Sequence, residues 1–229
     1  MKEAARLSLA LGLICLVAAG LLAFADAKTR EPRARAANAE RQKALAVVLP
    51  SFDNDPVSDK ATVNWDGGEV TFYRARKGGQ ILGLAGEGVS NQGYGGRLQV
   101  LVGFAPDGTL GTVLVTAHRE TPGLGTRVTD RREVTSIWSV FSACGAQVDC
   151  GGSAPRVPPC TYLDQYSSGQ RLFRTTDAPF RVKQDGGTVQ AVAGATVSSR
   201  AVADALSRIA AAFGANQGTL LGGAPAASK

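Results

Sequence analysis

The sequence predicts an α+β fold, mainly an antiparallel sheet with flanking helices, preceded by one N-terminal transmembrane helix. Three patterns support this prediction: an uncharged apolar stretch near the N-terminus, short apolar runs separated by turn signals between positions 62 and 116, and one amphipathic helical pattern near the C-terminus. Short strands joined by tight turns pair antiparallel, which favours an α+β domain over a doubly wound sheet. With 229 residues, 44% of them hydrophobic, the chain suffices for one domain behind a short anchor.

The apolar stretch Leu7–Ala25 contains no charged residue over 19 positions. A helix of this length spans ~28 Å, close to the hydrocarbon thickness of a bilayer. A cleavable signal peptide is the alternative, because Ala23-Phe24-Ala25 has the small-x-small pattern of a cleavage site. Since the apolar region of a signal peptide usually runs for only about 7–15 residues, the length favours a signal-anchor helix within residues 1–25.

The net charge of +6 is concentrated next to this helix. Residues 1–43 contain eight Lys or Arg and four Asp or Glu, whereas the remaining 186 residues contain seventeen and fifteen. No basic face interleaved with aromatic side chains is present, so the charge pattern argues against nucleic-acid binding. Basic residues flank the helix on both sides, and counting them alone would keep the C-terminal domain in the cytoplasm. The cysteines described below suit an oxidising compartment instead, so both orientations stay open.

A juxtamembrane stalk is expected over residues 26–61, with a helix from Ala36 to Leu49 that Pro50 ends. The globular domain is expected over residues 62–214. Its predicted strands are Val70–Tyr73, Ile81–Leu84, Leu98–Phe104 and Leu110–Thr116, and its turn signals lie at residues 66–68, 77–79, 93–96 and 106–108.

A loop rich in Gly and Pro contains Cys144, Cys150 and Cys160. Their spacings match neither a zinc ribbon nor a CxxC redox pair, and the single His of the chain argues against a mixed Cys/His metal site. The pattern predicts one disulfide that pins the loop and one thiol left over, and it does not indicate which two cysteines pair.

The clearest helix is predicted from Ser198 to Phe213, where apolar residues recur at helical spacing. Gly214 is expected to cap its C-terminus, and Ser198 or Ser199 its N-terminus, because a hydroxyl there satisfies a free backbone N–H group. Residues 215–229 are small and rich in Gly and Ala, and are expected to form a flexible tail.

The stretch from Ala193 to Arg200 leads directly into this helix. A helix N-terminus combines unpaired N–H groups with a partial positive charge, and both favour a bound phosphate. Gly194 and Ala195 allow a bulky group to approach the backbone, Thr196 is placed to hold a phosphate covalently, and Arg200 could add a cationic contact. An ordinary capped helix after a glycine turn is the alternative interpretation.

A second candidate is the loop at residues 118–125, which reads HRETPGLG. Pro122 fixes one backbone dihedral while Gly123 and Gly125 permit unusual ones, so the loop is stiff and shaped. Such a loop could grip a flat heterocycle with its backbone amides; a plain turn is the alternative. His118, the only imidazole, is interpreted as structural or as a hydrogen bonder that orients the loop.

Five segments together resemble the FMN-binding domain family: residues 93–96 (GYGG), 103–111, 118–125, 162–166 (YLDQY) and 194–202. More narrowly, they look like the G subunit of the Rnf ion-translocating electron transport complex, with the C subunit of sodium-pumping NADH:quinone reductase as a close relative. The match covers most of residues 62–212, and the combination of ETPGLG with GAT at this spacing is its specific part.

The resemblance implies FMN as the cofactor, joined through its phosphate to Thr196, the Thr of the GAT motif, by a separate flavin transferase. It also implies other membrane subunits of an Rnf-type complex as partners, and a single-pass protein of the bacterial inner membrane with its soluble domain on the periplasmic side. The cofactor-binding residues expected on this basis are Thr196, Gly194, Ala195, Ser198, Glu120, Thr121, Gly123 and Leu124.

The chain departs from the family pattern at Ala193, where Ser or Thr is usual, and at Gln190, where Asp is usual. Both departures concern recognition by the transferase. The cysteine-bearing region, about residues 134–161, looks like an insertion relative to the family. The expected function is electron relay on covalent FMN, as a redox subunit rather than a stand-alone catalyst. The alternatives are a membrane-anchored flavin sensor or assembly module, and a scaffold that carries no flavin.

Overall fold

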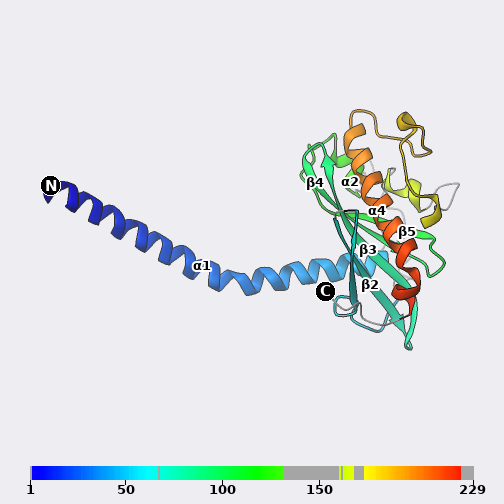
Figure 1. Ribbon diagram of the computed structural model, residues 1–229, viewed down its shortest axis with the longest axis horizontal. Coiled ribbons are helices and arrows are strands. Elements are labelled where there is room, and N and C mark those ends of the chain that lie inside the picture. Colours follow the sequence, from blue (N-terminus) through cyan, green and yellow to red (C-terminus); the bar gives the residue numbers. More distant parts are fainter. Residues whose placement is uncertain (1, 67, 132–159, 161, 168–172, 223–229) are drawn as a thin grey trace, which may run out of the picture. The chain divides into compact units, whose positions relative to one another are not determined.

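The computed structural model describes residues 2–66, 68–131, 160, 162–167 and 173–222 (Figure 1). The chain divides into two compact units, residues 1–43 and 44–229.

The described residues of the first unit are all helical. Helix α1 runs without interruption over Lys2–Val48 and contains Pro32, so the separate anchor and stalk helices expected from the sequence are one helix. Within the described part of the chain, α1 is the one helix long and apolar enough to cross a membrane. A cleavage after Ala25 would cut this helix in its interior.

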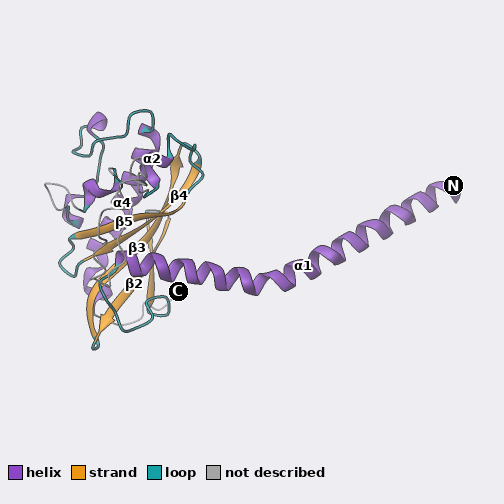
Figure 2. Ribbon diagram, turned by 180° about the vertical axis from the view of Figure 1, so that it is seen from behind, coloured by secondary structure: helices purple, strands orange, loops and turns teal. Residues whose placement is uncertain are grey.

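The second unit is built on a five-stranded antiparallel sheet in the order β1-β2-β3-β4-β5 (Figure 2), which confirms the predicted fold class. The bounds are β1 Lys60–Trp65, β2 Gly68–Lys77, β3 Gln80–Gly93, β4 Gly96–Phe104 and β5 Leu110–Ala117. The four predicted turns are the four connections between these strands, and Gly96 and Gly108 take φ values of +92° and +82°, which only glycine adopts without strain. Four of the strands were predicted from the sequence, and β1 was not recognised as a strand of its own.

Helix α4, Thr196–Leu221, packs across one face of the sheet and makes its most extensive contacts with β3 (Figure 1). Ile209 lies directly over two glycines of β3, and a Cβ atom built on Gly88 would lie 2.6 Å from Ile209 Cγ1. These glycines therefore let the helix approach the sheet closely. Phe213 adds a stacked contact with Phe104, with ring centroids 4.9 Å apart.

Three expectations about this helix were wrong. It passes through Gly214 and ends at Leu221 with Gly222 as the C-cap, so residues 215–221 are helical rather than a flexible tail. Its N-cap is Ala195, which makes no side-chain cap hydrogen bond, so neither serine at positions 198 and 199 is the cap. Both serines lie inside the first turn, where their hydroxyls bond other groups of the domain.

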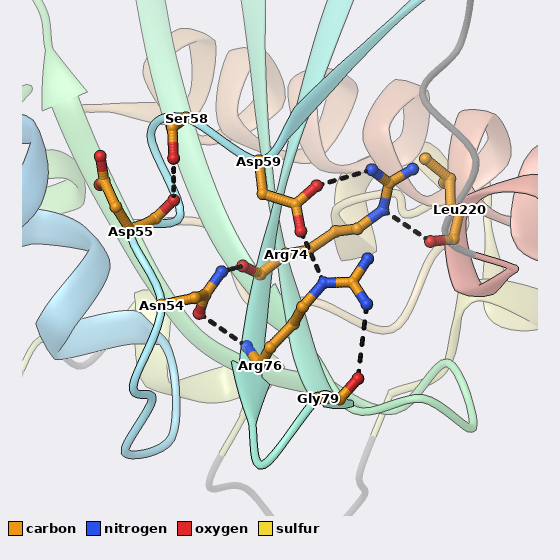
Figure 3. Close-up of polar contacts among 8 residues, drawn as sticks. All are labelled: Asn54, Asp55, Ser58, Asp59, Arg74, Arg76, Gly79 and Leu220. Carbon is orange, nitrogen blue, oxygen red and sulfur yellow. Dashed lines mark hydrogen bonds and ion pairs between the residues drawn. The ribbon is translucent and has the colours of Figure 1, made fainter.

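The extension of α4 is explained by a buried arginine on β2 (Figure 3). Arg74 Nε donates to the backbone oxygen of Leu220 at 2.8 Å, and its Nη1 donates to Asp59 Oδ1 at 2.9 Å. Arg76 Nε donates to the other oxygen of Asp59 at 2.7 Å. A cation at a helix C-terminus interacts favourably with the helix dipole, so Arg74 stabilises the last turns of α4. Gly214 and Gly218 lie in these turns and would otherwise weaken them. Burial opposes ionisation of Asp59, but the hydrogen bonds from Arg76 and Arg74 outweigh it and lower the pKa of this carboxyl.

The opposite face of the sheet is covered in part by the last turn of α1 and the residues after it. A small second core forms there, from Leu45, Val48, Leu49, Tyr73, Ala75, Ala85 and Leu101. The central strands of the sheet are therefore packed on both faces, with α4 on one side and this second core on the other.

Candidate functional site

Three segments converge at one end of the sheet and enclose a cleft of about 460 Å³. They are the tip of the β3–β4 hairpin, the loop after β5 and the N-terminus of α4. The cleft is lined by Tyr94, Glu120, Thr121, Leu124, Gly125, Gly194, Ala195, Thr196, Val197 and Ser198. In an antiparallel meander the β3–β4 turn and the last residue of β5 lie at the same end of the sheet, which is why these segments, far apart in sequence, meet here.

Seven of the eight residues expected from the sequence line this one cleft: Gly194, Ala195, Thr196, Ser198, Glu120, Thr121 and Leu124. Gly123 does not line it. Gly123 is an exposed turn residue within the loop, with φ at +81°, and its N–H donates to Thr126 Oγ1 at 2.9 Å. No site role was predicted for Tyr94, Gly125 or Val197. All three lie within segments that the sequence analysis singled out: Tyr94 in GYGG, Gly125 in ETPGLG and Val197 in residues 194–202.

Glu120 holds the three walls of the cleft together. Its side chain is only 6% exposed. Ser198 Oγ donates to Glu120 Oε2 at 2.6 Å, across 78 residues of sequence, and the N–H of Gly95 donates to Oε1 at a longer 3.4 Å. The carboxylate thus links the first turn of α4, the hairpin tip and its own loop. A Cβ on Gly125 would lie 2.7 Å from this carboxylate, so a glycine is required there.

His118 orients the same loop. Its Nδ1 accepts the N–H of Glu120 at 3.3 Å, and its Nε2 lies 2.9 Å from Asp130 Oδ1. Because Nδ1 is the acceptor, the proton of the neutral ring resides on Nε2 and is donated to Asp130. The imidazole has both nitrogens occupied by protein groups, in line with its interpretation as a loop-orienting hydrogen bonder.

The N-terminus of α4 opens into the cleft with free backbone donors. Thr196 is the first helical residue, and the first hydrogen bond at this end runs from the N–H of Ser199 to the carbonyl of Ala195, at 3.0 Å. The preceding N–H groups, of residues 196–198, have no acceptor within the described part of the chain. The half-buried Thr196 side chain likewise has no hydrogen-bond partner among the described residues.

Two buried tyrosines support this turn from the core. Tyr162 OH donates to the carbonyl of Ser199 at 2.6 Å and lies 2.9 Å from Tyr166 OH. Burial raises the pKa of both phenols, so they stay neutral and act as fixed hydrogen-bonding groups. The YLDQY segment therefore contributes to the site indirectly, by fixing the helix start.

Arg200, the residue expected from the sequence to add a cationic contact to a phosphate, is bound to Asp185 instead. Arg200 donates from Nε and Nη2 to the two oxygens of Asp185, both at 2.7 Å. The hydrogen bond from Arg200 lowers the pKa of Asp185. Gln190 and Ala193, the two departures from the family motif, are both exposed, and the side chain of Gln165 brackets the backbone of Gln190 with bonds of 2.8 and 3.0 Å.

The cysteine prediction falls mainly outside the described residues, which include neither Cys144 nor Cys150. Cys160 is described, and its thiol is free and buried. Its Sγ lies 3.7 Å from the carbonyl of Val128.

The rim of the cleft is apolar. Tyr94, Leu124 and Val197 are 74%, 50% and 43% exposed, and each comes from a different wall. In the described part of the second unit, Leu82 is the only other large hydrophobic side chain with comparable exposure. Exposed apolar groups gathered at a cleft mark a site for a ligand or a partner.

The sequence of the chain is similar to that of known proteins, and the similarity covers the residues that line the cleft. Residues 93–211 match the model of the FMN-binding domain, a range that begins at the β3–β4 hairpin and contains every residue lining the cleft. The chain is 31% identical to the G subunit of the ion-translocating oxidoreductase complex of Cereibacter sphaeroides, over 95% of this chain and 87% of that protein. It is 33% identical to the G subunit of Pseudomonas aeruginosa, over 94% and 91%, and 34% identical to that of Stutzerimonas stutzeri, over 93% and 81%.

The match to the family model and the extent of these similarities agree with the arrangement of the cleft. The chain therefore belongs to the FMN-binding domain family, with FMN as its cofactor, and within that family it groups with the G subunits of ion-translocating oxidoreductase complexes.

Proposed function

We propose that this protein carries FMN covalently, through a phosphoester bond between the flavin phosphate and Thr196, and relays electrons within a membrane-bound ion-translocating oxidoreductase complex. The observation that carries the proposal is the position of Thr196. An open hydroxyl, three free N–H groups and the positive end of α4 coincide at the mouth of one cleft.

The lining of the cleft fits both halves of the cofactor. A phosphate on Thr196 would lie beside the free N–H groups of the first helical turn, without any need for Arg200, which is held by Asp185. The three exposed apolar side chains at the rim suit the faces of a flat heterocycle. Glu120 and Thr121 belong to the same lining, and we expect them to orient the edge of the heterocycle.

The redox chemistry belongs to the bound FMN, which accepts and donates electrons one or two at a time. The protein's own residues bind and orient it. Glu120 and Ser198 fix the walls of the cleft, and Tyr162 fixes the first turn of α4. No nucleophile–base pair is required for this role, which agrees with a redox subunit rather than a stand-alone catalyst.

The partners follow from the relatives, whose names place them in ion-translocating oxidoreductase complexes. We expect other membrane subunits of such a complex to exchange electrons with this flavin, and a separate flavin transferase to attach it. Helix α1 would hold the protein in the bacterial inner membrane as a single-pass anchor. The family resemblance supports placing the second unit in the periplasm, whereas the charges that flank the helix alone favour the cytoplasm. External protease should digest the second unit in spheroplasts and spare it in inverted vesicles; the reverse pattern would contradict the periplasmic assignment.

The attachment is tested by expressing the full chain with a flavin transferase. A denaturing gel viewed under ultraviolet light should show a fluorescent band, and the intact mass should rise by one FMN minus one water. Thr196→Ala should abolish both signals, because no other hydroxyl replaces the acceptor.

Thr121→Ala is the matched control, because Thr121 is a second threonine in the same cleft. It should retain the covalent fluorescence. Fluorescence that survives Thr196→Ala, or wild-type protein recovered at its unmodified mass beside a working transferase, would contradict the proposal.

A further inference from the structure

Glu120 brings a buried negative charge to the cleft. Among the described residues that line the cleft it is the only one with a charged side chain, and that side chain is just 6% exposed. Its Oε2 accepts the hydrogen bond from Ser198 Oγ, and its Oε1 accepts the N–H of Gly95. Two oxygens that both accept hydrogen bonds are the pattern of an ionised carboxylate. Because both donors are neutral, they stabilise the charge without cancelling it.

The cations around the cleft either lie in solvent or are bound to other carboxylates. Three arginines of the surrounding segments are exposed: Arg97, Arg119 and Arg127. Arg200, in the first turns of α4, is bound to Asp185, and the buried side chain of Arg131 is bound to Asp164. Water and salt screen an exposed charge, whereas a buried one is screened much less. The charge of Glu120 therefore acts on the interior of the cleft more strongly than the exposed charges around it.

The other titratable groups of these segments lie outside the interior of the cleft. His118 and Asp130 bond each other at 2.9 Å, are partly buried and do not belong to the cleft lining. Tyr94, on the hairpin tip, is 74% exposed. A phenol of this kind ordinarily titrates near pH 10, and an imidazole near pH 6.5. Any titration of these groups is shared by proteins that differ only at position 120.

Reduction of a flavin adds charge to the same cleft. Two electrons taken up with one proton leave the isoalloxazine ring with one additional negative charge, and a second proton removes that charge. Like charges repel strongly in a site shielded from water, and the repulsion favours the protonated, neutral form. The positive end of α4 offers little relief, because the phosphate on Thr196 would occupy its free N–H groups.

We propose that the buried charge of Glu120 couples reduction of the bound flavin to the uptake of a second proton in the cleft. The inference rests on the proposed function, because it requires FMN in this cleft. The step balances as two electrons from another subunit of the complex and two protons from solvent for each flavin reduced. With a neutral side chain at position 120 the balance above neutral pH would be two electrons and one proton.

The midpoint potential of the flavin, followed against pH, reports the number of protons taken up. The full chain, flavinylated by co-expression with a transferase and kept in neutral detergent, is titrated spectroelectrochemically. A two-electron reduction with two protons changes the potential by about 59 mV per pH unit, and one with a single proton by about 30 mV. The slope changes at a break pH, for which free FMN in the same cell gives the reference.

We expect the break of the wild-type protein about one pH unit or more above that of free FMN. Glu120→Gln keeps the size of the side chain and removes its charge, so its break should lie about one unit or more below that of wild type, a tenfold or larger loss of proton affinity.

Two further variants separate charge from packing. Glu120→Asp alters the bond to Ser198 but restores the charge, so it should return the break toward that of wild type. Glu69→Gln is the matched control, because it makes the same change at an exposed carboxylate on β2. It should leave the break where it is in wild type.

Four results would each overturn the proposal: a wild-type break at or below that of free FMN, a Glu120→Gln break equal to that of wild type, or a downward displacement as large as that of Glu120→Gln in either Glu120→Asp or Glu69→Gln. The first needs no variant, so it applies even if a substitution prevents folding. Intact mass and flavin absorbance are recorded first. A wild-type protein without flavin would refute the proposed function, and this inference with it, whereas a displaced break in a flavinylated protein concerns this inference alone.

Discussion

The hydrogen bond between Ser198 and Glu120 provides the sharpest test of how the cleft is held together. The bond is short, at 2.6 Å, its acceptor is a carboxylate, and both side chains are buried. Hydrogen bonds to charged groups contribute roughly 1.5–3 kcal/mol, and removing one partner leaves the other unpaired. The second bond of the carboxylate, to the N–H of Gly95, is 3.4 Å long and contributes less.

Ser198→Ala and Glu120→Ala should therefore each lower the free energy of unfolding by about 1.5–3 kcal/mol, with Glu120→Ala at the upper end because it orphans two donors. The double variant loses the same bond only once. Its destabilisation should fall short of the sum of the single effects by about 1.5–2 kcal/mol. Equilibrium urea unfolding of the full chain in neutral detergent measures all four proteins, with the fluorescence of Trp65, which packs against the core, as the signal.

Ser199→Ala is the matched control. Ser199 is the next residue in the same turn, but its hydroxyl bonds only the backbone, donating to Ala195 and accepting from Val192. It should cost about 1 kcal/mol and add to Glu120→Ala without coupling. If Ser198→Ala and Glu120→Ala prove additive to within about 0.5 kcal/mol, the carboxylate does not hold α4 in place and the reasoning about the cleft is wrong.

Further predictions concern the packing and electrostatics that position α4. Gly88→Ala would place a Cβ 2.6 Å from Ile209 Cγ1 and should destabilise the protein by about 1–3 kcal/mol; Ile209→Ala should reduce that penalty, and additive effects in urea unfolding would contradict direct overpacking. Gly214→Ala replaces an exposed glycine in the helix interior with open space around it and should stabilise by about 0.5–1 kcal/mol, seen as a higher denaturation midpoint; no gain would mean that the helix frays there. The hydrogen bond from Arg76 helps to depress the pKa of Asp59 below 3.8, so its stabilising contribution is present above that pH and is lost as pH falls through the folded-state value. Asp59→Asn should therefore be less stable than wild type at neutral pH and converge with it in acid, whereas a constant difference at every pH would exclude this linkage.

The sheet was predictable because its signals are local. Each turn places glycine where the backbone needs it, as at Gly96 and Gly108, and strands that follow one another through tight turns pair with their neighbours. The end of α4 was not predictable from local signals. Gly214 resembles a helix stop, but a glycine within a helix costs only about 1 kcal/mol, and the contact of Arg74 with the carbonyl of Leu220 offsets that cost. That contact joins residues 146 positions apart, and no local pattern encodes it.

For the candidate site, too, one part was predictable from the sequence and another was not. Its segments were identified from their motifs, and the structure brings most of the expected residues into one cleft. Their mutual roles depended on geometry. The pairing of Glu120 with Ser198, the glycine required at position 125 and the diversion of Arg200 to Asp185 follow from the path of the chain in space. Spacing along the sequence carries no trace of these contacts.

The order of the strands has a consequence for how the protein matures. A meander in which every strand pairs with its sequence neighbour can assemble hairpin by hairpin as the chain emerges, since each pairing closes only a short loop. The cleft cannot form while the sheet assembles in this stepwise way, because one of its walls belongs to α4, the last helix of the chain to be synthesised. Any enzyme that recognises the whole cleft can therefore act only after α4 has been synthesised and has packed on the sheet. A chain truncated before α4 would present only the walls formed by the hairpin and the loop after β5.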